Sequence, residues 1–161
     1  MSITTHPALK PGNVAVITGA GAGGIGFAVA LHLARDLDLH TVLLDNNQHA
    51  LDLAAQHLAD EGVPEARFTT RRVDVSDPQQ LLDAADAVFD QLGRVDFLHL
   101  NAGVGGKSRT YGEGMLEDWD RIFKVNLGGV TAGSAAFVER MVAQVRLSLS
   151  LWLQSLFSCA T

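Results

Sequence analysis

Residues 14–26 read Val14-Ala15-Val16-Ile17-Thr18-Gly19-Ala20-Gly21-Ala22-Gly23-Gly24-Ile25-Gly26, and this stretch decides the fold. A short apolar run ends in a glycine-rich turn, and an apolar, alanine-rich segment follows the turn. This order predicts a strand, a tight loop and a helix. Glycine has no Cβ, so it allows positive φ angles and a close approach of the backbone to a ligand. Such a loop directs its amides and the helix N-terminus at an anion, usually a pyrophosphate.

A glycine-rich loop alone is also compatible with a flexible turn. A second apolar run, residues 41–44, ends at Asp45, which lies 19 residues after Gly26. This is close to the spacing of ~20 residues expected for a carboxylate that binds a ribose. The alternative is a turn residue within Asp45-Asn46-Asn47. As a ribose ligand Asp45 would repel a 2′-phosphate, and with no arginine expected beside it we predict NAD in preference to NADP.

Strands and helices alternate along the rest of the chain. Strands are predicted at about 13–18, 41–45, 67–73 and 95–100, with helices between them and a long helix from about 115 towards 145. Asp77-Pro78 predicts a helix start, and Gly93 predicts its end. This alternation predicts the α/β class, with a Rossmann-like, doubly wound parallel sheet and right-handed crossovers.

Four polar residues stand at or just after the predicted strand ends: Thr18, Asp45, Asp74 and Asn101. The carboxyl ends of parallel strands meet at one edge of a sheet, where ligands bind. We therefore expect these four side chains to converge on one crevice. Asp74 is equally compatible with an ordinary turn or capping residue before Asp77.

The composition indicates one globular domain. The hydrophobic share of 47% and the charged share of 19% in 161 residues argue against disorder. The net charge of −6, with no basic stripe, disfavours nucleic acid as a partner. A single cysteine, Cys159, excludes an internal disulfide and fits a reducing compartment. The histidines lack metal-ligand spacing, so no metal site is predicted.

No targeting or membrane signal is predicted. Residues 1–12 lack the apolar run of a secretory signal, and no stretch approaches the ~18 apolar residues of a membrane span. We therefore expect a cytoplasmic protein without membrane contact. We divide the chain into a loose leader at 1–12, a dinucleotide-binding domain at 13–146 and an atypical apolar tail at 147–161.

The motifs from 13 to 144 together resemble the short-chain dehydrogenase/reductase family. Thr18-Gly19 with Gly23-Gly24-Ile25-Gly26 resembles its cofactor loop, Asp74-Val75 its adenine-side element, Asn101-Ala102-Gly103 its Asn-Ala-Gly motif and Val125-Asn126-Leu127 the segment with its catalytic asparagine. The resemblance implies hydride transfer between a nicotinamide and a carbonyl or alcohol. It also implies a catalytic role for Asn126 and cofactor contacts from the other motif residues: Thr18, Gly19, Gly23, Gly24, Ile25, Gly26, Asp45, Asp74, Val75, Asn101, Ala102 and Gly103.

The sequence departs from the family pattern at the residues that carry out catalysis. The family uses a tyrosine four residues before a lysine, with a serine ahead of them. Here the one tyrosine is Tyr111, Met115 stands four residues later, and Tyr111 precedes Asn126, which is the wrong order. A positioned proton donor is worth ~10²–10⁴-fold in rate, so we expect impaired catalysis. The glycine-rich loop is also one residue longer than the common form, and Leu100 replaces a frequent asparagine.

Asn126 has a structural alternative. It falls on the same helical face as Trp119, Ile122, Phe123 and Val130, where a buried amide must be hydrogen-bonded. An amide does not titrate, so Asn126 cannot replace the missing tyrosine and lysine.

The tail from Leu147 is uncharged to Phe157, with leucines at every second position up to Leu153. It does not resemble the family's fifth strand. We hypothesise a truncated family member whose end was replaced through a splicing or reading-frame event. The tail could then add a substitute strand or continue the long helix, and the fourth strand would have an unpaired edge prone to aggregation. A homo-oligomer covering this surface is left open.

Three functions compete on these observations. The first is an NAD-dependent oxidoreductase by descent, with impaired catalysis. The second is a non-catalytic nucleotide-binding or interaction module that pairs with a full-length relative. The third is a methyltransferase, whose fold also has a glycine-rich loop and an acidic second strand end, and Asn101-Ala102-Gly103 argues against it.

Overall fold

A four-stranded parallel sheet forms the centre of the structure, a computed structural model that describes residues 6–106 and 114–158. Within these residues the strands are β1 (Val14–Thr18), β2 (His40–Asp45), β3 (Phe68–Arg72) and β4 (Phe97–Leu100). Their order is β3-β2-β1-β4, and all neighbouring pairs are parallel. The predicted Rossmann-like parallel sheet is confirmed.

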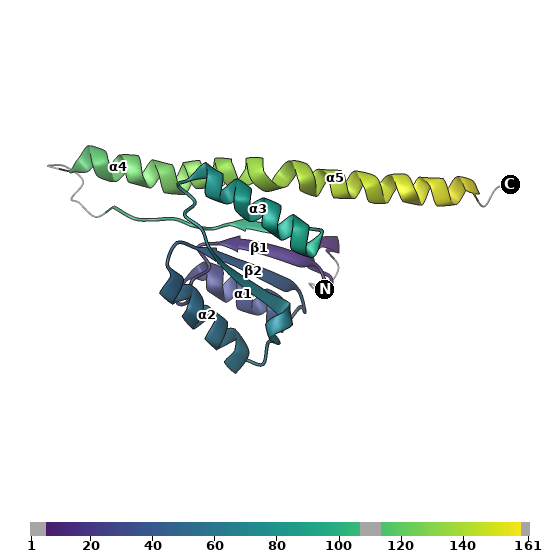
Figure 1. The fold of residues 1–161 in the computed structure, drawn as a ribbon, viewed down its shortest axis with the longest axis horizontal. Helices are drawn as coiled ribbons and strands as arrows, with labels where there is room; N and C mark the ends of the chain where they lie inside the picture. Colours follow the sequence, from purple (N-terminus) through teal and green to yellow (C-terminus); the bar gives the residue numbers. More distant parts are fainter. Residues whose placement is uncertain (1–5, 107–113, 159–161) are drawn as a thin grey trace.

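Helices cover both faces of the sheet (Figure 1). Helices α1 (Ile25–Arg35) and α2 (Gln48–Asp60) lie on one face, and α3 (Pro78–Leu92) and α5 (Gly129–Ser158) lie on the other. Successive residues of β1 serve opposite cores: Ile17 packs in the cluster with α1 and α2, and Val16 packs in the cluster with Phe89 and Phe137. All five residues of β1 are buried, as an interior parallel strand requires.

Local signals place the helix ends. The Asp77 carboxylate caps α3 by accepting from the Gln79 N–H at 3.0 Å, Pro78 follows it, and Gly93 ends the helix with φ +73°. Helix α2 is capped by Asn47, whose side chain accepts from the Ala50 N–H at 3.2 Å. These contacts satisfy amides that have no partner within the helix.

The fourth strand is shorter at its start than predicted. The prediction began at Val95, but β4 begins at Phe97 because the Gln144 side chain of α5 takes both backbone groups of Val95. Within the described residues, β4 pairs with β1 alone and lies at one edge of the sheet.

The described part of the predicted loose leader is ordered. Residues Pro7–Leu9 form a short 3₁₀ turn, η2. The Asn13 side chain donates to the Pro7 carbonyl at 2.8 Å, and Leu9 packs against the core shared by α1 and α2. The packing of the partly buried Leu9 and the hydrogen bond of Asn13 therefore hold this segment in place, although its prolines predicted only breaks in structure.

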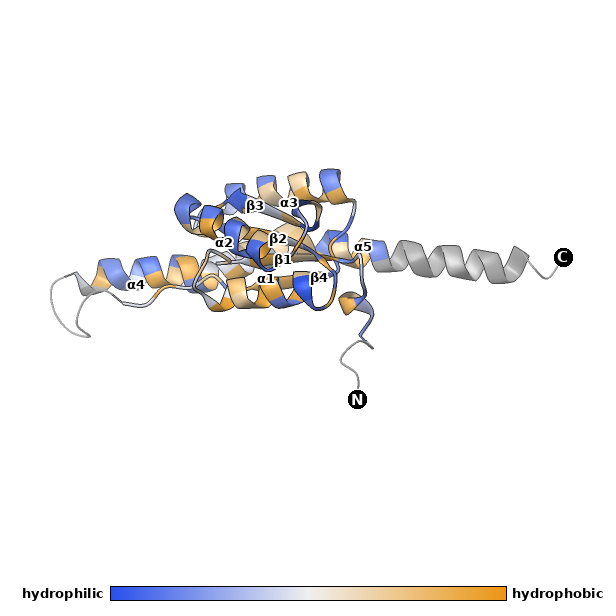
Figure 2. Cartoon of the chain, turned by 90° about the horizontal axis from the view of Figure 1, so that it is seen from below, coloured by the Kyte–Doolittle hydropathy of each residue, from blue (hydrophilic) through white to orange (hydrophobic). Residues whose placement is uncertain are grey.

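The predicted long helix is present but interrupted. It consists of α4 (Met115–Phe123), a π-helical segment η4 (Lys124–Gly128) and α5, whose backbone continues to Ser158. Of the two tail conformations left open by the sequence, the structure has the helix. Apolar and hydrophilic residues alternate along α4 (Figure 2), and its apolar residues Trp119 and Phe123 are 46% and 56% exposed. In the described part of the chain, no helix combines the length and hydrophobicity needed to cross a bilayer.

Candidate functional site

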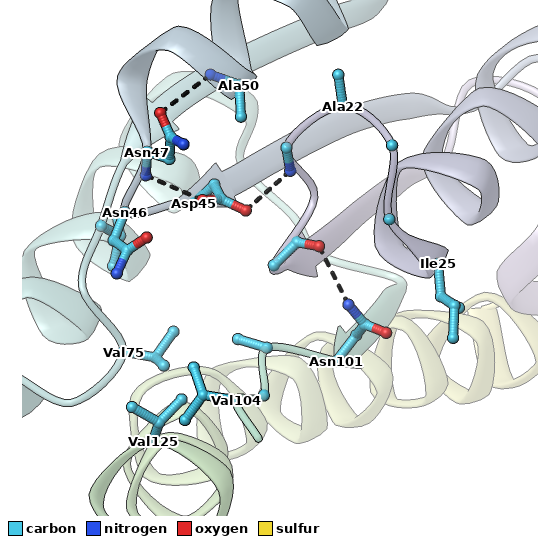
Figure 3. A pocket seen from close by; sticks show the side chains of 17 residues that line it. Ala22, Ile25, Asp45, Asn46, Asn47, Ala50, Val75, Asn101, Val104 and Val125 are labelled. Carbon is cyan, nitrogen blue, oxygen red and sulfur yellow. Dashed lines mark hydrogen bonds between the residues drawn. The ribbon is translucent and has the colours of Figure 1, made fainter. Parts of the chain in front are cut away.

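A cavity of about 560 Å³ opens at the carboxyl ends of the strands (Figure 3). It lies where the chain order reverses, because β1 has β2 on one side and β4 on the other. Parallel sheets bind ligands at this switch point. The cavity is lined by Gly19, Gly21, Ala22, Gly23, Gly24, Ile25, Asp45, Asn46, Asn47, Ala50, Val73, Val75, Asn101, Ala102, Gly103, Val104 and Val125.

The glycine-rich loop is bonded to the end of β2 and the start of α2. The Ala20 N–H donates to the Leu44 carbonyl at 3.1 Å, and the Ala22 N–H donates to the Ala50 carbonyl at 2.9 Å. Between them, the Gly21 N–H donates to Oδ2 of Asp45 at 2.9 Å. The loop is thus held over the cavity by its neighbours in the fold.

Close contacts with backbone atoms leave no room for a side chain at Gly19 and Gly26 of the loop. Gly19 has φ +65°, and a Cβ there would lie 2.7 Å from the Ala102 Cα. A Cβ at Gly26 would overlap the carbonyl oxygen of Gly19. At Gly24 the nearest such atom is 3.8 Å away, and this residue lines the cavity at the N-cap of α1. Bare backbone and the positive end of the helix dipole therefore face the cavity, which suits an anion.

Asp45 lies at the cavity wall with both carboxylate oxygens bonded to the backbone (Figure 3). Oδ2 accepts from the Gly21 N–H, and Oδ1 accepts from the Asn47 N–H, each at 2.9 Å. These donors orient the carboxylate at the end of β2. Each oxygen retains a lone pair that can accept from a ligand hydroxyl.

Thr18 and Asn101 join the ends of β1 and β4. The buried Thr18 hydroxyl accepts from the backbone N–H groups of Asn101 and Ala102 at 3.0 and 3.1 Å. The Asn101 side chain donates to the carbonyls of Thr18 and Gly19 at 3.0 and 3.1 Å. Thr18 does not line the cavity, whereas Asn101 does. Both side chains are used to position the glycine-rich loop.

Asn126 lies in the π-helical segment η4 and contacts the loop after β4. Its Oδ1 accepts from the Val104 N–H at 2.8 Å, and its Nδ2 donates to the Val104 carbonyl at 3.1 Å. The prediction of a buried amide at this position is wrong, because the face that carries Asn126 is solvent-exposed. Asn126 therefore holds the backbone of Val104, which lines the cavity, but Asn126 itself does not line the cavity.

The predicted cofactor residues divide by position. Gly19, Gly23, Gly24, Ile25, Asp45, Val75, Asn101, Ala102 and Gly103 line the cavity. Thr18 and Gly26 do not line it. Asp74 lines an adjoining hollow, and its Oδ1 accepts from the Ser76 N–H and hydroxyl at 2.9 and 2.7 Å, as in a turn.

Several lining residues escaped the sequence prediction. Gly21 belongs to the quoted loop and Asn46 follows Asp45, so adjacency to a predicted residue would have found both. Val73 precedes Asp74 and Val125 precedes Asn126, but apolar residues at a strand end or on a helix are ordinarily core, so both were passed over. Their place in the cavity depends on how β3 and the long helix pack.

One premise of the cofactor prediction is wrong: an arginine does lie beside Asp45. Strands β2 and β3 pair with Asp45 opposite Arg72, and Nε of Arg72 donates to the Asn46 carbonyl at 3.2 Å. Arg72 lies 27 residues further along the chain, so the sequence neighbours of Asp45 did not reveal it.

The described residues contain no group of three or more histidine, cysteine, aspartate or glutamate side chains arranged to hold a metal ion. The site therefore consists of backbone amides, one oriented carboxylate, amide side chains and apolar walls. That combination suits a phosphate-containing nucleotide with a ribose and a base.

A parallel sheet with a glycine-rich loop after β1 and a carboxylate at the end of β2 defines the class of Rossmann-like dinucleotide-binding folds. Residues 13–146 match the family described as short chain dehydrogenase, and the chain belongs to that family. Among curated relatives, 1-deoxy-11-beta-hydroxypentalenate dehydrogenase of Streptomyces exfoliatus is 36% identical over 133 residues, which is 82% of this chain and 46% of that protein.

Solved structures similar to this chain include cofactor complexes. A short-chain dehydrogenase/reductase from Burkholderia phymatum in complex with NAD is 38% identical, with a TM-score of 0.72 over 83% of this chain and 46% of that one. A metagenomic short-chain oxidoreductase in complex with NADP is 30% identical, with a TM-score of 0.71 over 84% of this chain and 59% of that one. Both cofactors therefore occur in the family. The chain spans about half the length of the curated relatives it matches.

Proposed function

We propose that residues 13–146 bind a nicotinamide dinucleotide in the cavity at the strand ends, with NAD preferred. The observation that carries this proposal is the joint position of the α1 N-terminus and the Asp45 carboxylate on one cavity. The pyrophosphate would lie against the amides of the glycine-rich loop. The adenosine ribose would donate its hydroxyls to Asp45.

The reaction class follows from the family. We propose an oxidoreductase by descent, in which the cofactor exchanges a hydride with a carbonyl or alcohol carbon. The proton on the substrate oxygen needs a positioned donor or acceptor. Asn126 cannot supply it because an amide does not titrate, and Tyr111 lies outside the described residues and lacks the lysine partner. We therefore propose that turnover is impaired and that Asn126 acts by holding Val104.

The second candidate is a non-catalytic nucleotide-binding or interaction module. The exposed apolar side chains of α4 and η4, among them Trp119, Phe123 and Leu127, favour contact with another protein. Co-purification would distinguish this module from an isolated binding domain. The interaction module requires a protein partner that co-purifies with it, whereas an isolated binding domain does not.

The test is thermal unfolding of the full chain with and without NADH, with NADPH as comparison, followed by a turnover assay. A ligand at about a hundred times its Kd stabilises the folded state by ~2.7 kcal/mol. We expect NADH to raise Tm and turnover to stay near the uncatalysed rate. A cooperative transition that neither nucleotide shifts would refute the binding proposal, and rapid turnover would refute impairment.

A further inference from the structure

Arg72 lies next to the carboxylate that we assign to the adenosine ribose. In the register of β2 and β3, Arg72 at the end of β3 pairs with Asp45 at the end of β2. Neighbouring strands lie ~4.8 Å apart. The two residues therefore place opposite charges side by side at the same edge of the sheet, one on each strand.

The guanidinium of Arg72 is held at one nitrogen only. Nε donates to the Asn46 carbonyl at 3.2 Å, and Arg72 is solvent-exposed. Across residues 6–106 and 114–158, the terminal nitrogens of Arg72 form no ion pair or hydrogen bond with a protein acceptor. An oriented guanidinium with open donors is a suitable partner for the paired oxygens of a phosphate.

A second hollow of about 400 Å³ lies beside Arg72. It is lined by Asn46, Arg72, Asp74 and Gln80. Asn46 also lines the larger cavity, so the two spaces adjoin at the residue after Asp45. A group attached to the ribose beside Asp45 would reach this hollow by passing Asn46.

We infer that Arg72 is a specificity-determining residue that binds the 2′-phosphate of NADP in the hollow beside Asn46. This inference rests on the proposed dinucleotide site. The guanidinium donates hydrogen bonds to the phosphate oxygens and offsets the repulsion from the Asp45 carboxylate. The site then discriminates against NADP less strongly than a lone Asp45 would.

The neighbouring carboxylates limit the size of this effect. Asp74 lines the hollow and Asp45 lines the adjoining cavity, and one oxygen of Asp74 is already bonded to Ser76. Like charges repel at this range. NADH should therefore still bind more tightly than NADPH, and Arg72 sets the ratio of the two affinities without reversing it.

The experiment measures the Kd of NADH and NADPH for the full chain and for Arg72→Ala, Arg72→Lys and Arg71→Ala. Arg71 is the matched control, because adjacent strand residues point to opposite faces and Arg71 pairs with Leu44. We expect Arg72→Ala to weaken NADPH about tenfold and NADH less than about twofold. Arg72→Lys should retain part of the NADPH affinity, and Arg71→Ala should leave the ratio unchanged.

A second probe isolates the phosphate. 2′,5′-ADP and 5′-ADP share the adenosine and the 5′-phosphate, so their comparison reports the 2′-phosphate alone. Arg72→Ala should weaken only 2′,5′-ADP, and rising salt should reduce the difference.

The two proposals fail in distinguishable ways. If the unmodified chain binds neither NADH nor NADPH, the dinucleotide site is refuted and the role of Arg72 with it. If NADH binds but Arg72→Ala leaves the NADPH to NADH ratio unchanged, the role of Arg72 alone is refuted. Unliganded Tm values for each variant confirm that the compared chains are folded.

Discussion

The Asp45 carboxylate accepts a hydrogen bond from the backbone N–H of Gly21 at 2.9 Å, which joins the end of β2 to the glycine-rich loop after β1. Gly21 itself is close-packed, since a Cβ there would lie 2.7 Å from the Ala50 Cβ. The residue proposed to bind the ribose therefore also shapes the loop proposed to bind the pyrophosphate. Loss of Asp45 would disturb both parts of the site.

Asp45→Ala is expected to lower the stability of the unliganded chain. It removes the acceptor of two backbone amides, and hydrogen bonds to charged groups contribute ~1.5–3 kcal/mol each at most. A loss of ~1–3 kcal/mol should lower Tm by several degrees. Asp52→Ala is the control, because among the described residues this exposed carboxylate bonds the Gln48 side chain alone. Equal Tm values for the two variants would contradict the structural role of Asp45.

Two glycines of the loop are expected to separate folding from binding. Gly26→Ala places a Cβ against the Gly19 carbonyl and should destabilise the fold by about 3 kcal/mol or more. Gly24→Ala has space and φ −105°, so it should lose less than about 1 kcal/mol. Its Cβ occupies the cavity wall, however, and should reduce the Tm shift caused by NADH. Thermal unfolding with and without NADH measures both, and a full NADH shift in Gly24→Ala would contradict the assigned pyrophosphate position.

Asn126→Ala is expected to release Val104 without unfolding the chain. The variant removes both bonds between the Asn126 amide and the Val104 backbone. Amide hydrogen exchange at Val104 should become faster, whereas exchange in the β1 core should stay unchanged. Asn126→Asp keeps an acceptor for the Val104 N–H and should protect it more than alanine does. Unchanged exchange at Val104 in Asn126→Ala would argue against this role of Asn126.

Stability is expected to fall in mild acid through His40. Burial lowers the pKa of His40 below 6.5, and the positive charge of Arg67 lowers it further, although the Ala66 carbonyl opposes both. The unfolded chain therefore binds more protons than the folded chain as the pH drops through 6.5 towards the lowered value, so acid favours unfolding in that window. Urea unfolding between pH 8 and pH 5 measures this. His40→Gln should have a flatter profile, and identical profiles would exclude His40 as the source.

The sequence by itself determined the elements with local causes. The apolar run and glycines of residues 14–26 specify a strand, a loop and a helix because buried backbone must pair and tight turns need glycine. Asp77-Pro78 and Gly93 bound α3 because a capping carboxylate, a fixed proline φ and a left-handed glycine each act within one helical turn. The alternation of strands and helices then predicted a parallel sheet with a crevice at the carboxyl ends of its strands.

Tertiary structure alone decided which partners the polar side chains of the site have. Asn101 bonds the carbonyls of Thr18 and Gly19, Asn126 bonds Val104, and Arg72 lies beside Asp45. Each contact joins segments that are more than 20 residues apart, so no local pattern records it. The register of β2 against β3 and the packing of the long helix set these contacts. The sequence therefore predicted where a ligand would bind, whereas the fold assigned Thr18, Asn101 and Asn126 to holding that site together.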